Sequence, residues 1–457
     1  MILSRVVTSV WDRFILITKP EQSGKTFLLI KMVNHFFEED KETKKTTINF
    51  IFCDNSLLLT KQTTSRVKKE VKTLPDIDDP YVEFSSRKDG SAIGTYKAVI
   101  GAITTGCTNI ICCTNGKRVT DISSIINELN SSPFTKDRIV FKIWLDEADK
   151  FNGHITNTFI PIVTMHNNVS VFCLTATPQP LLNKYGEMRV IPIDITTSPH
   201  YHGWRDNNIV ICDNEGENTV GFAHQIADQI ECSTGFIAGI KGYVPADTKK
   251  TTHRHMRDVF LAKKVAVYVV NGEGIELSLP DGNRVLVEKT KELQEQLSEL
   301  YIEYNVSRWA CIVTGSICIG RGISIMHPNF LFDFGILSNC SKKTEASQNA
   351  GRLKGNIKNW STYKAPTVYT TVKFDKIATE YEEYSREIAR LAYAKDPDQP
   401  SIITKTEAKH GIKDKGWDLF MEEFNRLEDA NMFLQSHKCR QKKTFKNKDK
   451  NGFILST

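Results

Sequence analysis

The chain has 457 residues, of which 40% are hydrophobic and 25% are charged, a composition that excludes a largely disordered, collagen-like or disulfide-dense protein. This length exceeds what one compact core usually holds and predicts two domains with an appendage. The net charge of +6 is unevenly distributed, because residues 436–450 contain seven basic residues and one acid. The surplus charge therefore lies in the tail, and the remaining chain is balanced.

The cysteines and apolar stretches indicate the compartment. Eleven cysteines are scattered, with no C-x-x-C pair and no histidine spacing typical of zinc, so we interpret them as buried free thiols in a reducing compartment. Arg5, Asp12 and Arg13 interrupt the N-terminal apolar residues, which argues against a secretory signal. The longest uncharged stretch, residues 98–116, is too polar for a membrane span. The sequence predicts a soluble, intracellular protein without a membrane partner.

Short β-branched, apolar runs alternate with helix-like segments, the pattern of parallel sheets covered by helices. Two series of strands are expected, separated by a polar, breaker-rich linker at residues 196–203. We therefore predict an α/β protein with two tandem parallel-sheet domains, residues 1–196 and 204–375. The first series of expected strands covers residues 14–18, 48–53, 109–113, 139–145 and 169–175, and the second covers 209–212, 235–240, 265–270, 311–314, 331–337 and 368–372.

Beyond residue 375 the composition changes. Residues 375–396 have apolar side chains at three- and four-residue spacing, which predicts an amphipathic helix. A second helical stretch is expected at residues 417–433, followed by the basic tail. Residues 376–457 are thus predicted to form a small, mainly helical and basic extension.

The first motif is a loop between a strand and a helix. After the strand 14–18 the chain reads K-P-E-Q-S-G-K-T, and such a loop aims backbone N–H groups and a helix N-terminus at phosphate oxygens. Lys25 supplies a mobile charge and Thr26 a hydroxyl for Mg²⁺. Lys19 and Gln22 replace residues that are usually small, and a solvated turn is the alternative. The predicted phosphate-binding residues are Gln22, Ser23, Gly24, Lys25 and Thr26.

The second motif is a pair of carboxylates after a buried strand, followed 29 residues later by T-A-T-P. The carboxyl edge of a parallel sheet is where open α/β folds bind ligands. There Asp146 can hold Mg²⁺ and Glu147 can activate water, as metal-assisted phosphoanhydride hydrolysis requires. Thr175 and Thr177 on the neighbouring strand can hydrogen-bond the acidic residues. The alternatives are an acidic helix start and a helix cap with proline.

Two further motifs lie in the second half. G-R-G-I-S at residues 320–324 follows one expected strand, and Q-N-A-G-R at residues 348–352 follows another. An arginine delivered from a second domain to a γ-phosphate stabilises the charge of the transition state. Arg352 fits this role, with a surface salt bridge as its alternative.

In chain order, S-G-K-T, D-E-A-D, T-A-T-P, G-R-G-I and Q-N-A-G-R resemble motifs I, II, III, V and VI of superfamily 2 helicases, over about residues 13–375. Stretches such as I-F-C-D-N-S-L-L-L-T look most similar to divergent helicases of large DNA viruses and phages. The resemblance implies two RecA-like domains, ATP and Mg²⁺ in the cleft between them, and a single nucleic-acid strand across both. It also implies a partner in viral replication or transcription machinery, a host cytoplasm or nucleus as location, and packaging in virions.

Carried onto matching positions, the resemblance assigns phosphate and Mg²⁺ binding to Lys25 and Thr26, metal binding to Asp146 and water activation to Glu147. Coupling of hydrolysis to movement falls to Thr175 and Thr177. The resemblance also implies that Gly322 lines the cleft and that Gln348 and Arg352 complete the site from the second domain.

The chain departs from the family in several places. Gly355 stands where motif VI usually has a second arginine, with Lys354 beside it, and no aspartate follows G-R-G-I. An adenine-reading glutamine motif and a P-T-R-E-L segment are absent. The literal D-E-A-D therefore does not indicate a DEAD-box RNA helicase, and the glutamine-led motif VI favours DNA over RNA.

Basic residues are the expected contacts to nucleic acid, because Lys and Arg neutralise phosphates. We predict such contacts for Arg321, Lys442, Lys443 and Lys446, with a solvated charge run as the alternative for the tail. The leading hypothesis is an ATP-dependent helicase or translocase. The alternatives are a translocase that remodels or releases complexes, as in transcription termination, and a catalytically silent nucleic-acid-binding module.

Overall fold

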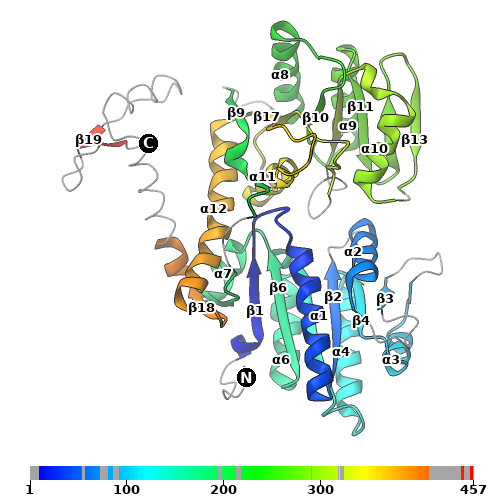
Figure 1. Cartoon of the computed structure of the whole chain (residues 1–457), viewed down its shortest axis with the longest axis vertical. Helices are drawn as coiled ribbons and strands as arrows, with labels where there is room; N and C mark the ends of the chain where they lie inside the picture. Colours follow the sequence, from blue (N-terminus) through cyan, green and yellow to red (C-terminus); the bar gives the residue numbers. More distant parts are fainter. Residues whose placement is uncertain are drawn as a thin grey trace.

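The computed structural model describes residues 10–53, 57–72, 81–85, 92–193, 198–212, 218–289, 291–316, 319, 324–410, 444–446 and 453–455. Within this part of the chain, two eight-stranded sheets stand one above the other, each covered by helices (Figure 1). We refer to the elements around the first sheet as the first domain and to those around the second sheet as the second domain.

The first sheet has the strand order β18-β7-β1-β6-β5-β2-β4-β3, and every neighbouring pair is parallel except β18 with β7. Its central strands are buried on both faces, as near-continuous apolar runs require. The strands are β1 (Phe14–Thr18), β2 (Thr46–Cys53), β3 (Tyr81–Phe84), β4 (Asn109–Cys113), β5 (Ile139–Asp146), β6 (Val169–Thr175), β7 (Glu187–Val190) and β18 (Ser401–Thr404).

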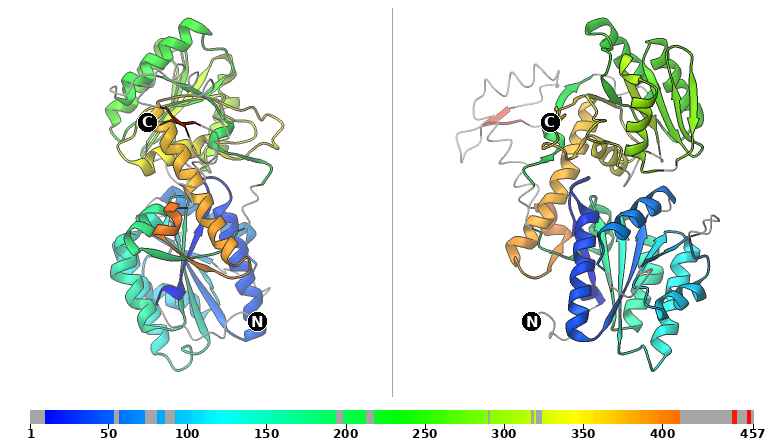
Figure 2. Two further views of the ribbon diagram at one scale, coloured as in Figure 1. Left: turned by 90° about the vertical axis from the view of Figure 1, so that its left-hand side faces the viewer. Right: turned by 45° about the vertical axis from the view of Figure 1, so that its right-hand side comes forward.

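The helices of the first domain cover both faces of this sheet (Figure 2). Side-chain caps define two of their starts: Thr95 accepts from the Ala98 N–H before α3, and Asn115 accepts from the Arg118 N–H before α4. The helices are α1 (Lys25–Thr43), α2 (Leu57–Glu70), α3 (Tyr96–Thr104), α4 (Gly116–Ser131), α5 (Asn152–His154), α6 (Ile160–Met165) and α7 (Gln179–Tyr185), with the single turns η1 (Val10–Arg13), η2 (Ala148–Lys150) and η3 (Ile155–Phe159).

The second sheet has the order β13-β12-β11-β14-β10-β15-β17-β9. Its centre is parallel, and β11, β12 and β13 form an antiparallel meander at one edge. The strands are β9 (Asn208–Ile211), β10 (Lys241–Tyr243), β11 (Ala266–Asn271), β12 (Gly274–Ser278), β13 (Arg284–Val287), β14 (Cys311–Gly315), β15 (Phe334–Leu337) and β17 (Thr367–Thr370). The helices are α8 (Thr219–Ser233), α9 (Lys250–Ala262), α10 (Leu293–Glu303) and α11 (Lys343–Ala350), with the turns η4 (Trp204–Asp206), η5 (Val306–Arg308) and η6 (Gly351–Leu353).

One long helix joins the two domains. Helix α12 (Val372–Lys395) starts beside the second sheet, where Trp204 Nε1 donates to Asp375 Oδ1 at 2.7 Å. It then packs on the first domain, where Ser385 Oγ lies 2.8 Å from Thr18 Oγ1 at the end of β1. The chain then turns back, and β18 pairs antiparallel with β7. The expected boundary at residue 375 falls inside this helix, and residues up to 410 pack against the first domain (Figure 1).

The fold class expected from the sequence, two tandem α/β domains built on mainly parallel sheets, is confirmed. The expected strands 14–18, 109–113 and 169–175 match β1, β4 and β6 exactly, and the amphipathic helix at 375–396 corresponds to α12. The strand expected at 235–240 is wrong. Gly235 and Gly239 both adopt positive φ, which breaks an extended run, and β10 begins only at Lys241.

Several other expectations differ from the structure or lie beyond it. The expected linker contains a short strand, β8 (Tyr201–His202), which pairs with β16 (Gly355–Asn356). The helix expected at 417–433 lies outside the described residues. No described helix is long and apolar enough to cross a membrane. The described cysteines are all free thiols, and most are buried, as expected.

Candidate nucleotide-binding cleft

The predicted phosphate-binding loop connects β1 to α1 at the carboxyl edge of the first sheet. Gly24 has φ +93°, a left-handed conformation that glycine adopts without strain, and the Leu28 N–H donates to its carbonyl at 3.0 Å to open the helix. Lys25 and Thr26 are the first two helical residues. Ser23 turns inward, because its Oγ donates to the Pro20 carbonyl at 2.6 Å. The loop thus presents a helix N-terminus, a lysine and a hydroxyl to one space.

The two carboxylates lie at the end of β5, which is separated from β1 by β6 alone. The Glu147 N–H donates to Asp146 Oδ1 at 3.1 Å, and Glu147 has φ +59°, so the chain turns sharply between these residues. Burial and the adjacent Glu147 raise the pKa of Asp146, while Lys25 opposes the shift. Two adjacent carboxylates, one buried and one half-buried, beside a lysine are suited to binding a divalent cation.

Thr175 and Thr177 form a buried bridge behind the carboxylates. Thr175 Oγ1 donates to Asp149 Oδ1 at 2.9 Å and accepts from the Thr177 N–H at 3.0 Å. Both threonines are fully buried. The predicted hydrogen bond between this segment and the acidic residues is present, through Asp149 on η2, while neither threonine reaches the cleft.

The second domain contributes Gln348 and Arg352, from α11 and η6. Both side chains are buried, and Arg352 Nε donates to the Gln348 carbonyl at 3.3 Å. Gly351 between them is needed for the close approach of the domains, because a Cβ there would lie 2.7 Å from Glu21 Cβ. Within the described part of the chain, Gln348 Nε2 is buried without a hydrogen-bond partner. A buried donor of this kind indicates a ligand that accepts from it.

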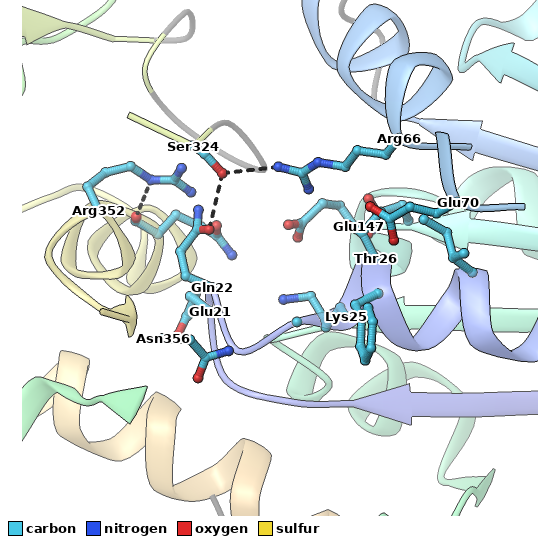
Figure 3. Close-up of a pocket in the computed structure, with 15 residues that line it drawn as sticks. Glu21, Gln22, Lys25, Thr26, Arg66, Glu70, Glu147, Ser324, Arg352 and Asn356 are labelled. Carbon is cyan, nitrogen blue, oxygen red and sulfur yellow. Dashed lines mark hydrogen bonds between the residues drawn. The ribbon is translucent and has the colours of Figure 1, made fainter. Parts of the chain in front are cut away.

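These elements surround a cleft of about 280 Å³ between the domains (Figure 3). The structure brings together there most of the predicted residues whose side chains it describes, while Ser23, Thr175 and Thr177 lie behind the cleft wall. Arg321, Gly322, Lys442 and Lys443 fall outside the described residues, as does the side chain of Lys446 on β19 (Thr444–Lys446), which pairs with β20 (Phe453–Leu455). The predicted residues that line the cleft are Gln22, Gly24, Lys25, Thr26, Asp146, Glu147, Gln348 and Arg352.

Sequence reasoning missed several residues of the cleft. Arg66 on α2 reaches in from the first domain, with Nη2 3.4 Å from Ser324 Oγ, which itself lies 3.4 Å from Gln22 Oε1 (Figure 3). No motif marks Arg66, which is one of many charged residues on an ordinary helix, so no sequence signal distinguished it. The other unpredicted lining residues are Glu21, Phe27, Ile30, Glu70 and Asn356.

A buried ion cluster fastens the loop to the second domain. Lys354 Nζ lies 2.6 Å from Glu21 Oε2 and 3.1 Å from Glu382 Oε2, and neither Glu21 nor Lys354 is appreciably exposed. Burial alone would raise the pKa of Glu21, but the charge of Lys354 outweighs it and lowers that pKa. Burial alone would lower the pKa of Lys354, but the two carboxylates outweigh it and raise that pKa. The Tyr201 hydroxyl donates to the Glu21 carbonyl at 3.0 Å. Lys354 is thus engaged in the ion cluster formed by Glu21, Lys354 and Glu382.

The cleft fits a nucleoside triphosphate with Mg²⁺. Cationic side chains line it from both domains, which suits a phosphate chain. Thr26 and Asp146 offer the oxygen ligands that Mg²⁺ prefers. Glu147 supplies a further carboxylate, and the buried Gln348 amide a donor. No group of three or more His, Cys, Asp or Glu side chains that could hold a metal ion occurs among the described residues, those of the cleft included.

Comparisons with known proteins add the following. No protein-family model and no curated protein matches the sequence. Among solved structures, the chain is similar to Mss116p lacking its NTE and C-tail, bound to ssRNA and AMP-PNP, with 15% identity and a TM-score of 0.45 over 79% of this chain and 66% of that one. It is also similar to the DEAD-box helicase Mss116 bound to ssRNA and UDP-BeF, with 16% identity, a TM-score of 0.46, and coverage of 79% and 67%. The chain thus spans about two thirds of the length of these proteins.

Proposed function

We propose that this protein hydrolyses ATP in the cleft between its domains and couples hydrolysis to movement along, or unwinding of, nucleic acid, as a superfamily 2 helicase or translocase. The observation that carries the proposal is the convergence of Lys25, the carboxylates Asp146 and Glu147, and Arg352 on one cleft. The first three come from the first domain and the last from the second. A site completed only when two domains meet makes their relative position depend on the nucleotide.

Each residue has a role that follows from its place. Lys25 and the N-terminus of α1 bind phosphate oxygens, while Thr26 and Asp146 hold Mg²⁺. Mg²⁺, when bound, neutralises charge on the phosphates and orients them. Glu147 accepts a proton from the attacking water, and Arg352, positioned with Gln348, stabilises the developing charge on the terminal phosphate.

Coupling of hydrolysis to nucleic acid involves the threonines at or just after the end of β6 and the basic residues. Thr175 bonds Asp149 and Thr177 bonds Thr175, and this chain of hydrogen bonds supports a coupling role for the two threonines. The preference for DNA and the similarity to viral helicases rest on sequence alone and stay predictions. Arg321, Gly322 and the basic tail likewise stay predicted contacts to nucleotide or nucleic acid.

A nucleic-acid-stimulated ATPase assay tests the proposal. Glu147→Gln keeps the size of the side chain and removes its basicity, so we expect hydrolysis to fall on the order of 10²-fold or more while ATP binding persists. Glu128→Gln, an exposed change on α4, is the matched control and should leave hydrolysis unchanged. Hydrolysis insensitive to both Glu147→Gln and added nucleic acid would refute the proposal.

Two other functions make different predictions. A translocase that remodels complexes would displace bound protein without separating strands, and assaying both activities on one substrate set distinguishes it. A silent binding module would bind nucleic acid in a salt-dependent way without turnover. The convergence of Lys25, Glu147 and Arg352 favours an active site over such a module. Comparing stimulation by single-stranded DNA, duplex DNA and RNA identifies the nucleic acid.

A further inference from the structure

Arg66 is a cation in the cleft that the known motifs do not explain. It lies on the third turn of α2, and its guanidinium points into the cleft from the first domain, across from Arg352 (Figure 3). Its contact with Ser324 Oγ, at 3.4 Å, is longer than a strong hydrogen bond. Among the described residues it forms no salt bridge. A half-buried guanidinium that makes no salt bridge within the described part of the chain is available to a ligand.

The position of Arg66 relative to the carboxylates fits a phosphate ligand. Its positive charge is close enough to stabilise the ionised form of Asp146, as the charge of Lys25 does. The close-up shows the carboxylate of Glu147 below the Arg66 guanidinium, on the side of Lys25 (Figure 3). Arg66 therefore lies on the same side of the cleft as the groups that would hold the metal and the attacking water.

The second domain leaves room for such a cation. After Arg352 the chain continues with Lys354, whose ammonium is fully buried between two carboxylates, and with Gly355, which has no side chain. Of these three residues, only Arg352 lines the main cleft. The charge on a terminal phosphate is usually met by more than one cation.

We propose that Arg66 binds the terminal phosphate of the nucleoside triphosphate, as a second guanidinium opposite Arg352 that the first domain supplies. The proposal rests on the proposed function, because it concerns the same cleft. Lys354 cannot bind phosphate while it is paired with Glu21. The proposal assigns that role to Arg66, on a different element. Because Arg66 and Arg352 come from different domains, both contacts form together only when the cleft is closed.

Measurements of nucleotide affinity distinguish binding of the terminal phosphate by Arg66 from a structural role. For Arg66→Ala in the full chain, we expect the affinity for a non-hydrolysable ATP analogue to fall roughly tenfold or more, since a charge-assisted hydrogen bond is lost. The affinity for ADP should change by less than about threefold, because ADP lacks the terminal phosphate. The turnover number should fall on the order of 10²-fold. Lys69→Ala, an exposed change on the same helix, should alter none of these values.

Two further variants distinguish phosphate binding by Arg66 from a structural role. Arg66→Lys retains the charge and should recover part of the discrimination between ATP and ADP, which a merely structural role would not predict. Unchanged ADP affinity shows that Arg66→Ala is folded. Ser324→Ala removes the contact across the cleft and should cost less than Arg66→Ala.

Two results would overturn the proposal. One is an Arg66→Ala variant that distinguishes ATP from ADP as the wild type does. The other is a Ser324→Ala variant that reproduces the full loss, because Arg66 would then act by bridging the domains. If the wild type hydrolyses ATP, either of these results contradicts the role of Arg66 and leaves the proposed function of the protein unaffected. A wild type that binds ATP without hydrolysing it would contradict the proposed function and leave the binding test of Arg66 valid.

Discussion

Glu147 occupies an unusual backbone conformation for a non-glycine residue. Its φ of +59° lies in the left-handed region, which costs about 1–3 kcal/mol for residues held there. The surrounding packing is what maintains it, since Ala148 and Phe151 just after it are fully buried. The sequence D-E-A-D predicted two carboxylates at a sheet edge, but it contains no signal for this turn. The turn sets the two side chains apart, as the proposed roles of Asp146 in metal binding and of Glu147 in water activation require.

Thr175 yields a prediction at the scale of one hydroxyl. Thr175→Val keeps the shape and removes the donor to Asp149, so the variant should lose about 1 kcal/mol of stability. If the threonine couples hydrolysis to nucleic acid, ATP affinity should persist while stimulation by nucleic acid falls. Parallel ATPase titrations with and without nucleic acid measure this. Thr120→Val on the exposed side of α4 is the control, and equal stimulation in both variants would contradict the coupling role.

At the scale of elements, β18 shows what a local reading of the sequence misses. Strands β1, β4 and β6 were predictable because uninterrupted apolar runs mark strands buried on both faces. β18 reads S-I-I-T, with Ile402 exposed and Ile403 fully buried, which is too short to distinguish from a loop. Only the return of the chain along α12 brings it to β7. The composition of residues 376–457 therefore did not predict that β18, in the first part of this extension, belongs to the first sheet.

Ile403 tests this contribution. Ile403→Ala removes a fully buried side chain from the first domain's core and should cost about 2–4 kcal/mol. Ile402→Ala, at the next position and 46% exposed, should cost less than about 0.5 kcal/mol. Urea unfolding followed by circular dichroism gives the midpoint for each variant. Similar midpoints for the two variants would show that β18 contributes little to the stability of this sheet.

The basic tail is a separate case, because most of it lies outside the described residues. Deleting residues 436–457 removes seven of the basic residues and should weaken nucleic-acid binding and flatten its dependence on salt. Basal ATP hydrolysis should persist, since the cleft residues all lie before residue 357. Binding measured over a salt series tests the first part. Loss of basal hydrolysis would instead mean that the tail is part of the fold.

The cleft itself was only half predictable. Contributors with a compact motif, such as Lys25, Asp146 and Arg352, were identified from spacing. Arg66 and Glu21 were not, because their importance comes from tertiary placement: α2 lies beside the cleft, and Glu21 faces Lys354. Such placement depends on the packing of whole domains, which no short pattern encodes.

At the scale of the whole molecule, the ion cluster of Glu21, Lys354 and Glu382 holds the domains together. Lys354→Met removes the cation that two buried carboxylates share; Glu382 keeps its ion pair with Arg386 at 2.6 Å, so the loss falls mainly on Glu21 and should be about 3 kcal/mol. Glu21→Gln combined with Lys354→Met removes one of those charges and should recover part of the loss. A double-mutant cycle from unfolding midpoints checks the coupling. Additive effects of the two substitutions would mean that the pair does not link the domains.

The same cluster predicts a dependence on pH. Pairing with Lys354 holds the pKa of Glu21 below its ordinary value of 4.5, so the stabilisation is fully present above that value and is lost as pH falls through the folded pKa. The pKa of Lys354 is raised above 10.5, so its contribution persists up to that pH and is lost only above the folded value. Unfolding midpoints of the wild type should therefore fall more steeply below about pH 4.5 than those of the double variant. Parallel curves would contradict this.

The position of α12 has a mechanical consequence. This helix of 24 residues is anchored to both domains along one side of the cleft, whereas α2 lies on the opposite side (Figures 1 and 2). The domains cannot move straight apart without unpacking it, so opening must be a rotation about an axis near α12. Displacement in a rotation grows with distance from the axis, and the α2 side of the cleft therefore travels furthest. Contacts there would separate first, while those near α12 stay in place to guide reclosure.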